Sequence, residues 1–352
     1  MKYLSDPKNE FEVFRAIILY GANTASYKFA LGQSLLELSL AGKDFVKLEE
    51  LAVPFSRQVV EHIRSGKRQS TSVSSKFIYG CQLYVDGKID QGELIEHTTR
   101  YGFKNVIDAF PNLRIGQGDQ VQFYQKAVRD NRKGIVLTDN LHKMVRERQA
   151  DNLIHEIEGR WNLVETSWSE QNSALLIEYD DINQLFVAKS GGSNESYLNS
   201  HLRKPVTYAR KPLSGYQKGR CFYCYDDISV DSNRPNTAAV DHFFPISMQT
   251  RIASRAHLNL NDVWNLVLAC KCCNGENSDS KWKHTPARHL LHDLERRNNY
   301  YIESKHPLGQ TIMQLTGRSA AGRRGYLDSV FALAKEVSSY EWSPKEIKGL
   351  PF

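Results

Sequence analysis

Two pairs of cysteines constrain this chain more than any other feature. The first pair is Cys221 and Cys224 and the second is Cys270 and Cys273, with 45 residues between the pairs. Each C-x-x-C turn lets two sulfurs converge on one ion, so the four cysteines predict a tetrahedral structural zinc site that joins the ends of an inserted segment. Cys272 competes with Cys273 for the fourth position, and we favour Cys273 because its spacing mirrors the first pair.

The distribution of cysteines also indicates a cellular compartment. Five of the six cysteines lie between residues 221 and 273, and Cys81 stands alone. Clustered pairs in a chain without a secretory signal favour zinc in a reducing compartment over a disulfide framework. The sequence has no run of about 18 apolar residues, the length that a membrane span requires. We therefore expect a cytoplasmic protein that has no contact with a membrane.

A chain of 352 residues is long enough for two domains. The best linker is the Gly/Ser-rich segment 190–196, so we expect a mainly helical N-terminal region over 1–190, with a regulatory, partner-binding or DNA-binding role. The metal-binding domain and a C-terminal helical tail then occupy 191–352, and the fold class is α+β. Helical spacing is evident for Phe11, Phe14, Ile17 and Ile18, for Leu31, Leu35, Leu36 and Leu38, and for Leu51, Phe55, Val59 and Ile63.

The segment between the cysteine pairs carries residues suited to hydrolytic chemistry. Residues 237–240 predict a strand that runs into Asp241 and His242, Asn265 precedes an apolar run, and Asn274 follows the last cysteine. Histidine accepts a proton near neutral pH, and carboxylate and amide oxygens suit a hard cation such as Mg²⁺. Phosphodiester hydrolysis needs such a base and such a cation, because the phosphate is negatively charged.

The order C-x-x-C, Asp-His-x-x-Pro, Asn-Leu-Val-Leu, C-x-x-C-Asn over residues 221–281 resembles the HNH endonuclease family in its zinc-stapled ββα-metal form. The resemblance implies hydrolysis of a nucleic-acid phosphodiester with one divalent cation, usually Mg²⁺, bound between a β-hairpin and a helix. It implies that His242 is the general base and that Asp241 and Asn274 hold the cation. It also implies that Asn265 ties the connecting loop to the hairpin.

The chain departs from the family pattern at one position and leaves alternatives open. The family often has a lysine three residues after the last ligand, where this chain has Asn277, while Lys281 comes later. Either Asn274 or Asn277 can therefore be the second metal ligand, and we prefer Asn274 because it directly follows the cysteine. The alternatives to a DNA endonuclease are an RNA-cleaving HNH nuclease and a non-catalytic, zinc-stabilised module for nucleic-acid binding or assembly.

Charge favours a nucleic-acid substrate for the second half of the chain. Residues 201–352 hold 22 Lys/Arg and 14 Asp/Glu, a balance of +8, and residues 1–200 have a balance of −2. A basic surplus around the metal motif suits a polyphosphate such as DNA. Protein partners or a homodimer through the N-terminal region are further expectations. The helices around residues 29–31 also loosely resemble those of HNH proteins in bacterial anti-phage defence or restriction.

Overall fold

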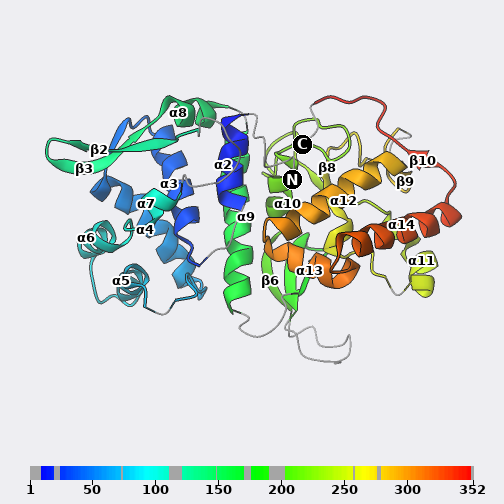
Figure 1. Cartoon of the computed structure of the whole chain (residues 1–352), viewed down its shortest axis with the longest axis horizontal. Coiled ribbons are helices and arrows are strands. Elements are labelled where there is room, and N and C mark those ends of the chain that lie inside the picture. Colours follow the sequence, from blue (N-terminus) through cyan, green and yellow to red (C-terminus); the bar gives the residue numbers. More distant parts are fainter. Residues whose placement is uncertain are drawn as a thin grey trace. The chain divides into compact units, whose positions relative to one another are not determined.

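The structure, a computed structural model, describes residues 9–19, 24–72, 74–110, 121–147, 149–169, 176–189, 203–256, 258–275 and 279–349 (Figure 1). The chain divides into two compact units, residues 1–169 (unit 1) and residues 170–352 (unit 2). Both units combine helices with small, separate sheets, in agreement with the α+β class. Within the described ranges, no helix has both the length and the apolar character needed to cross a membrane.

Unit 1 is mainly helical. Its helices are α2 (Glu10–Leu19), α3 (Tyr27–Leu40), α4 (Leu48–Arg64), α5 (Lys76–Val85), α6 (Gln91–Tyr101), α7 (Val106–Ala109), α8 (Asp139–Arg146) and α9 (Ala150–Ser169). The three helices expected from apolar spacing are α2, α3 and α4, and they pack around the aromatic side chains of Phe14, Phe29, Phe55, Phe77 and Trp161. Pro54 lies inside α4 and does not end it, because the flanking Leu51 and Phe55 are fully buried and hold both halves of the helix against the core.

A three-stranded antiparallel sheet in unit 1 was not expected. It consists of β1 (Phe45–Lys47), β2 (Tyr124–Arg129) and β3 (Arg132–Leu137), in the order β1-β3-β2. The turn between β2 and β3 is formed by Asp130 and Asn131, whose φ angles of 49° and 57° suit a two-residue β-hairpin. The strands were not predicted, because β2 has mostly exposed residues and little apolar alternation.

Unit 1 also buries a charged network around His62. The imidazole ring stacks on Trp161, with 3.8 Å between ring centroids and 6° between planes. Its Nδ1 lies 2.6 Å from Glu165 Oε1, and its Nε2 lies 3.4 Å from Glu158 Oε2. Burial by itself lowers the pKa of His62, but the two carboxylates outweigh it and raise the pKa to about 9. His62 is therefore a charged packing residue of unit 1.

Unit 2 begins with a three-stranded sheet and has three helices near its C-terminal end. Its elements are β4 (Leu176–Asp180), β5 (Leu185–Lys189), β6 (Arg203–Tyr208), α10 (Arg210–Gln217), β7 (Ala239–His242), the 3₁₀ turn η2 (Ile246–Met248), α11 (Gln249–Ala256), the 3₁₀ turn η3 (Val263–Asn265), β8 (Leu266–Ala269), β9 (Thr285–Pro286), α12 (Arg288–Glu303), α13 (Pro307–Thr316), α14 (Ala320–Val337) and β10 (Glu341–Trp342). Helices α12, α13 and α14 pack on one another (Figure 1). The expected closing helix is α14, which buries Leu327, Val330, Phe331 and Ala334.

The predicted domain boundary lies inside unit 2. The Gly/Ser-rich segment 190–196 falls outside the described residues, but the strands on either side of it, β5 and β6, pair antiparallel in one sheet. The compact units divide at Ser169 instead. A Gly/Ser-rich composition is common to interdomain linkers and to connections between paired strands, so composition alone does not separate them.

The raised pKa of His62 predicts a pH-dependent stability. Because the pKa is about 9 in the folded state against 6.5 as its ordinary value, the charged imidazolium stabilises the fold. This contribution, on the order of 3 kcal/mol, is complete below about pH 6.5 and is lost as the pH rises through 9. Urea unfolding of wild type and His62→Gln should therefore show a deficit for the variant at about pH 6 that shrinks by about pH 10.

The two glutamates provide the control. Glu158→Gln and Glu165→Gln should each lower the pKa of His62, as followed by NMR titration of its ring protons. A deficit for His62→Gln that stays constant with pH would contradict the charged state.

Candidate metal centre and active site

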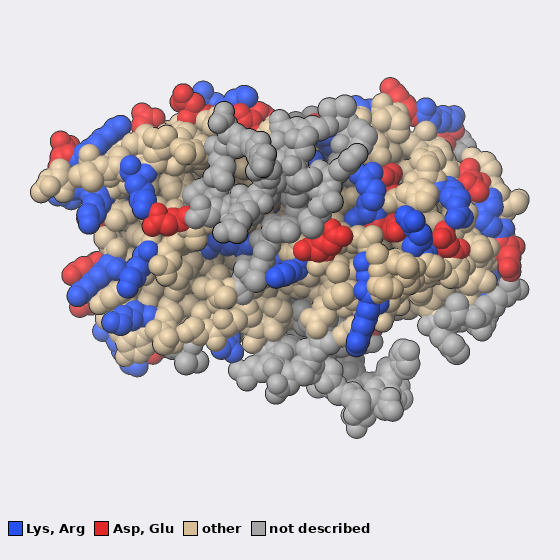
Figure 2. Space-filling model, viewed as in Figure 1, with Lys and Arg blue, Asp and Glu red and all other residues tan. Residues whose placement is uncertain are grey.

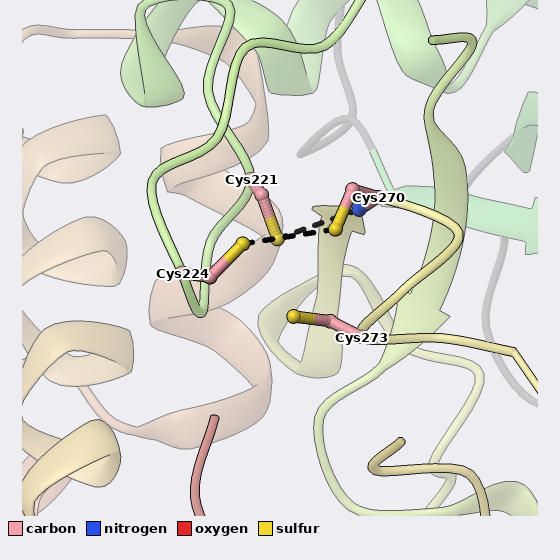
Figure 3. Close-up of side chains that lie close together, drawn as sticks. All are labelled: Cys221, Cys224, Cys270 and Cys273. Atoms are coloured by element: carbon pink, nitrogen blue, oxygen red, sulfur yellow. Dashed lines mark hydrogen bonds between the residues drawn. The ribbon is translucent and has the colours of Figure 1, made fainter. Parts of the chain in front are cut away.

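The four predicted zinc ligands converge in unit 2. Their sulfur atoms lie within 4.8 Å of one another, and all four residues are buried (Figure 3). Cys224 Sγ and Cys270 Sγ are 3.7 Å apart, close to the roughly 3.8 Å between sulfurs that a tetrahedral Zn–S distance of about 2.3 Å gives. The donor set and spacing fit a structural zinc ion.

Each cysteine pair is held in a tight turn, which we call a knuckle: knuckle 1 is residues 221–224 and knuckle 2 is residues 270–273. In knuckle 1, the Cys221 amide donates to Asp226 O at 2.8 Å. In knuckle 2, the amides of Cys273 and Asn274 both donate to Cys270 O, at 3.1 and 3.0 Å. These backbone bonds aim the two sulfurs of each turn at one point.

The structure decides between the two candidates for the fourth ligand. Cys273 is buried among the other three sulfurs, whereas Cys272 is exposed. Burial raises the pKa of the Cys221 thiol, and a bound divalent cation would favour its thiolate form. In the described part of the chain, no second group of three or more His, Cys, Asp or Glu side chains is close enough to hold an ion.

Two of the predicted catalytic residues, Asp241 and His242, lie at the end of β7, which pairs antiparallel with β8. The register places Asp241 opposite Val267 and His242 opposite Leu266. All four β8 residues are buried, and Asp241 and His242 are only 6% and 8% exposed. The sequence predicted this strand and the turn that follows it, because small and β-branched residues lead into Pro245.

Asp241 is engaged by two buried side chains. Its Oδ1 lies 3.2 Å from Lys281 Nζ, and its Oδ2 accepts a hydrogen bond from the Tyr223 hydroxyl at 2.6 Å. Lys281 Nζ also donates to His242 O at 2.8 Å, and the Lys281 side chain has no exposed surface. Burial lowers the pKa of Lys281, and the Asp241 carboxylate opposes this shift. The aspartate therefore faces a positive charge supplied by the chain itself.

His242 is held by the loop that precedes β8. Its Nε2 lies 2.7 Å from Asn261 Oδ1. An amide oxygen only accepts, so Nε2 carries the proton in this pair and Nδ1 keeps the lone pair. Burial lowers the pKa of His242, while the Asn261 hydrogen bond and the Asp241 charge act in the opposite direction. The Tyr179 ring of β4 packs edge-on against the imidazole, with 5.9 Å between centroids. Burial thus favours the neutral form of His242, and Asn261 orients its ring.

Asn265 joins the hairpin to the connecting loop. Its side-chain amide donates to Phe244 O at 3.0 Å and to Leu260 O at 2.8 Å, and its Oδ1 accepts from the Phe244 amide at 2.8 Å. Asn265 is completely buried, so these bonds are shielded from water. The turn after His242 is therefore bonded through Asn265 to the loop that carries Asn261.

The expected helix after the second cysteine pair is not present in the described residues. Asn274 directly follows knuckle 2, with its amide bonded to Cys270 O and its side chain half-buried, and Asn277 falls outside the described residues. The first described helix after β8 is α12, which begins at Arg288. The intervening segment is rich in Gly, Asn, Ser and Asp, which favour turns over helix interiors.

Four residues around the site were missed or left without a role by sequence reasoning. Tyr223, Asn261 and Lys281 bond directly to Asp241 or His242, and Tyr179 packs on His242. Tyr223 lay within a C-x-x-C turn, but nothing local distinguishes a tyrosine that bonds a distant carboxylate from one that fills a core. Lys281 drew notice only as a displaced family lysine.

Some basic side chains of unit 2 are bonded within the fold and others are exposed. Arg323 is buried and donates to Asn299 Oδ1 and to Arg318 O, and Arg324 pairs with Glu295. Arg251 on α11 is exposed. On the face drawn in Figure 2, Lys and Arg are interspersed with Asp and Glu. The described charges therefore do not gather into one basic patch on this face.

Comparison with protein-family models, with curated proteins and with solved structures finds no match to this chain. Function is therefore argued from the site itself.

Metal analysis of two cysteine variants tests the zinc site. The wild-type protein should hold about one zinc ion per chain, as four thiolates bind one tetrahedral ion. Cys273→Ser should lose most of this zinc, because it removes a ligand, and Cys272→Ser should keep it, because that side chain is exposed. Equal zinc contents in the two variants would contradict the assigned ligand set.

Unfolding of a lysine variant tests the buried ion pair. Lys281→Met leaves the Asp241 carboxylate without its cation, and breaking a buried pair in this way typically costs about 3–5 kcal/mol in the free energy of unfolding. The matched control is Lys283→Met two residues away, where the lysine is exposed and lies over the Trp282 ring; its cost should stay below about 1 kcal/mol. Both are measured by urea unfolding of the zinc-loaded protein.

Proposed function

We propose that the protein is a metal-dependent HNH-type endonuclease that hydrolyses phosphodiester bonds in DNA. The observation that carries the proposal is the meeting of a neutral histidine, a buried carboxylate and a bracing asparagine at one end of β7 and β8. His242 acts as the general base, and Asp241 and Asn274 hold the divalent cation. Asn265 braces the turn that follows His242. The four cysteines hold a structural zinc ion that does not take part in the reaction.

The base has the required protonation state. With its proton on Nε2 toward Asn261, His242 presents Nδ1 as the nitrogen that accepts a proton from water. Burial keeps the pKa below its ordinary value of 6.5, so the neutral form predominates at neutral pH. The hydrogen bond to Asn261 fixes the ring plane, so that little reorganisation precedes proton transfer.

The proposed cation site offers few protein ligands, namely one carboxylate and one amide oxygen. Carboxylate and amide oxygens suit Mg²⁺, which keeps several waters when few protein ligands are offered. The bound ion would stabilise charge on the phosphate and on the leaving oxygen. Lys281 already contacts Asp241 Oδ1, so the cation shares this carboxylate with an ammonium group, and we expect its affinity to be modest.

A non-catalytic, zinc-stabilised module for nucleic-acid binding or assembly is the second candidate. The observation that favours it is the engagement of both Asp241 oxygens by Tyr223 and Lys281, which satisfies the carboxylate without a metal. The position of Asn274 in a turn, and not on a helix facing the hairpin, points the same way. An RNA-cleaving nuclease would use the same groups, and only its substrate would differ.

A biological role in restriction or phage defence is supported only by the loose resemblance of the helices around residues 29–31 to those of anti-phage defence proteins. Phe29, Ala30 and Leu31 are completely buried in the unit 1 core. Their burial accounts for their apolar character through packing alone. Protein partners or a homodimer through unit 1 likewise stay proposals.

Cleavage of supercoiled plasmid with Mg²⁺ tests the catalytic proposal. Wild type should convert the plasmid first to the nicked circle, because a single site cuts one strand at a time. His242→Ala should lower the rate by roughly 10²- to 10⁴-fold, the usual contribution of a general base. The acid limb of the wild-type pH–rate profile should lie below pH 6.5, because burial lowers the pKa of His242.

The control is His289→Ala, which removes an exposed histidine of α12, and it should cut like wild type with the same zinc content. Parallel single-stranded and duplex RNA substrates separate the DNA and RNA readings. If His242→Ala cuts as fast as wild type, the mechanism is wrong, and if no substrate is cut with any divalent metal, the binding module is favoured.

A further inference from the structure

The carboxylate of Asp241 is held by one residue from each side of the four-cysteine site. Tyr223 lies inside knuckle 1, between Cys221 and Cys224, and its hydroxyl donates to Oδ2. Lys281 contacts Oδ1 from the other side. The Lys281 amide donates to Cys273 O at 2.8 Å, so this lysine is bonded to the backbone of knuckle 2. Both oxygens of the proposed metal ligand thus depend on the placement of the knuckles.

Both knuckles are anchored on β8. Knuckle 1 has an anchor of its own, because the Phe222 amide donates to Leu268 O of β8 at 2.9 Å. Gln217 adds two bonds to the same β8 residue, from Nε2 to its carbonyl and from its amide to Oε1. Knuckle 2 continues directly from β8, and the Cys270 amide donates to Cys221 Sγ at 3.4 Å. A zinc ion held by both pairs would cross-link the two knuckles that place Tyr223 and Lys281.

We propose that Tyr223 and Lys281 are positioning residues that make the orientation of Asp241, and with it cleavage, depend on metal occupancy of the four-cysteine site. This inference rests on the proposed function for the role of Asp241 in catalysis. The physical link is short: zinc joins the knuckles, the knuckles place a hydroxyl and an ammonium group, and these two groups set the direction of both carboxylate oxygens. Lys281 also bonds His242 O, so the base shares the same support.

Tyr223→Phe is the sharpest test, because it removes one hydroxyl and keeps the buried ring. The ring packs against Phe243 and Trp342, so the fold should be retained. With zinc fully bound, the variant should cleave roughly 10- to 100-fold more slowly, as is typical when a partner of a metal ligand is removed. The loss should appear in kcat with KM for DNA unchanged, because Tyr223 is buried away from substrate.

Tyr225→Phe is the matched control. Tyr225 directly follows Cys224, but its hydroxyl contacts Asp293 Oδ2 at 3.4 Å and not Asp241. Its removal should leave the cleavage rate, kcat and zinc content at wild-type values. Equal rates for Tyr223→Phe, Tyr225→Phe and wild type at equal zinc content, with wild type active, would overturn the positioning role and leave the nuclease proposal standing.

A second measurement does not need cleavage. The side-chain carboxyl ¹³C resonance of Asp241, assigned by its loss in Asp241→Asn, reports the hydrogen bonds to its two oxygens. It should shift when a zinc-selective chelator removes the structural ion in the presence of Mg²⁺, and it should shift in Tyr223→Phe but not in Tyr225→Phe. A resonance that ignores both zinc removal and Tyr223→Phe would refute the coupling, even if the enzyme is active.

The two measurements keep the proposals separate. If wild type cuts no substrate but the Asp241 resonance follows zinc and Tyr223, the nuclease function fails while the coupling of the metal site to the aspartate is supported. If cleavage is lost in His242→Ala and the resonance is indifferent to zinc, the function is supported and the coupling is wrong.

Discussion

The convergence of four buried sulfurs is the constraint on which the functional half of this protein depends. The knuckles are separated by 45 residues, and both sit against the same strand, β8, one by a backbone bond to Leu268 and the other as its direct continuation. The four close, buried cysteines could hold a metal ion such as zinc, and that ion would cross-link the two turns. The hairpin that carries Asp241 and His242 then lies between two fixed points.

The ion pair between Asp241 and Lys281 is almost completely shielded from water. Asp241 and His242 are more than nine-tenths buried, yet both oxygens of Asp241 and the Nε2 of His242 have polar partners. Lys281 balances the carboxylate with a full charge at 3.2 Å. Such a pair is costly to break, so it preserves a single geometry. Lys281 would also compete with a catalytic divalent cation for Asp241 Oδ1. A stronger Lys281–Asp241 ion pair would therefore lower the affinity of Asp241 for that cation.

Unit 1 contains buried charged groups that pair directly with one another. Its buried His62 is charged because two glutamates of α9 face it, and its ring is stacked on Trp161. Arg15 and Glu156 form a second buried ion pair, at 2.7 Å, between α2 and α9. These ion pairs add directional bonds between helices that also pack through apolar contacts. The helical unit is therefore defined by directional bonds as well as by its aromatic core.

The sequence by itself determined the features that local pattern encodes: the helices α2, α3 and α4 through apolar spacing, the four-cysteine cluster through C-x-x-C turns, and the strand that ends in Asp241 and His242. Tertiary structure alone decided that Cys273 and not Cys272 joins the cluster, that β4 and β5 belong to unit 2, and that Tyr223, Asn261 and Lys281 engage the site. The physical reason is that periodicity and turn chemistry are properties of neighbouring residues, whereas the pairing of buried polar groups depends on which distant segments the packed core brings within hydrogen-bond distance.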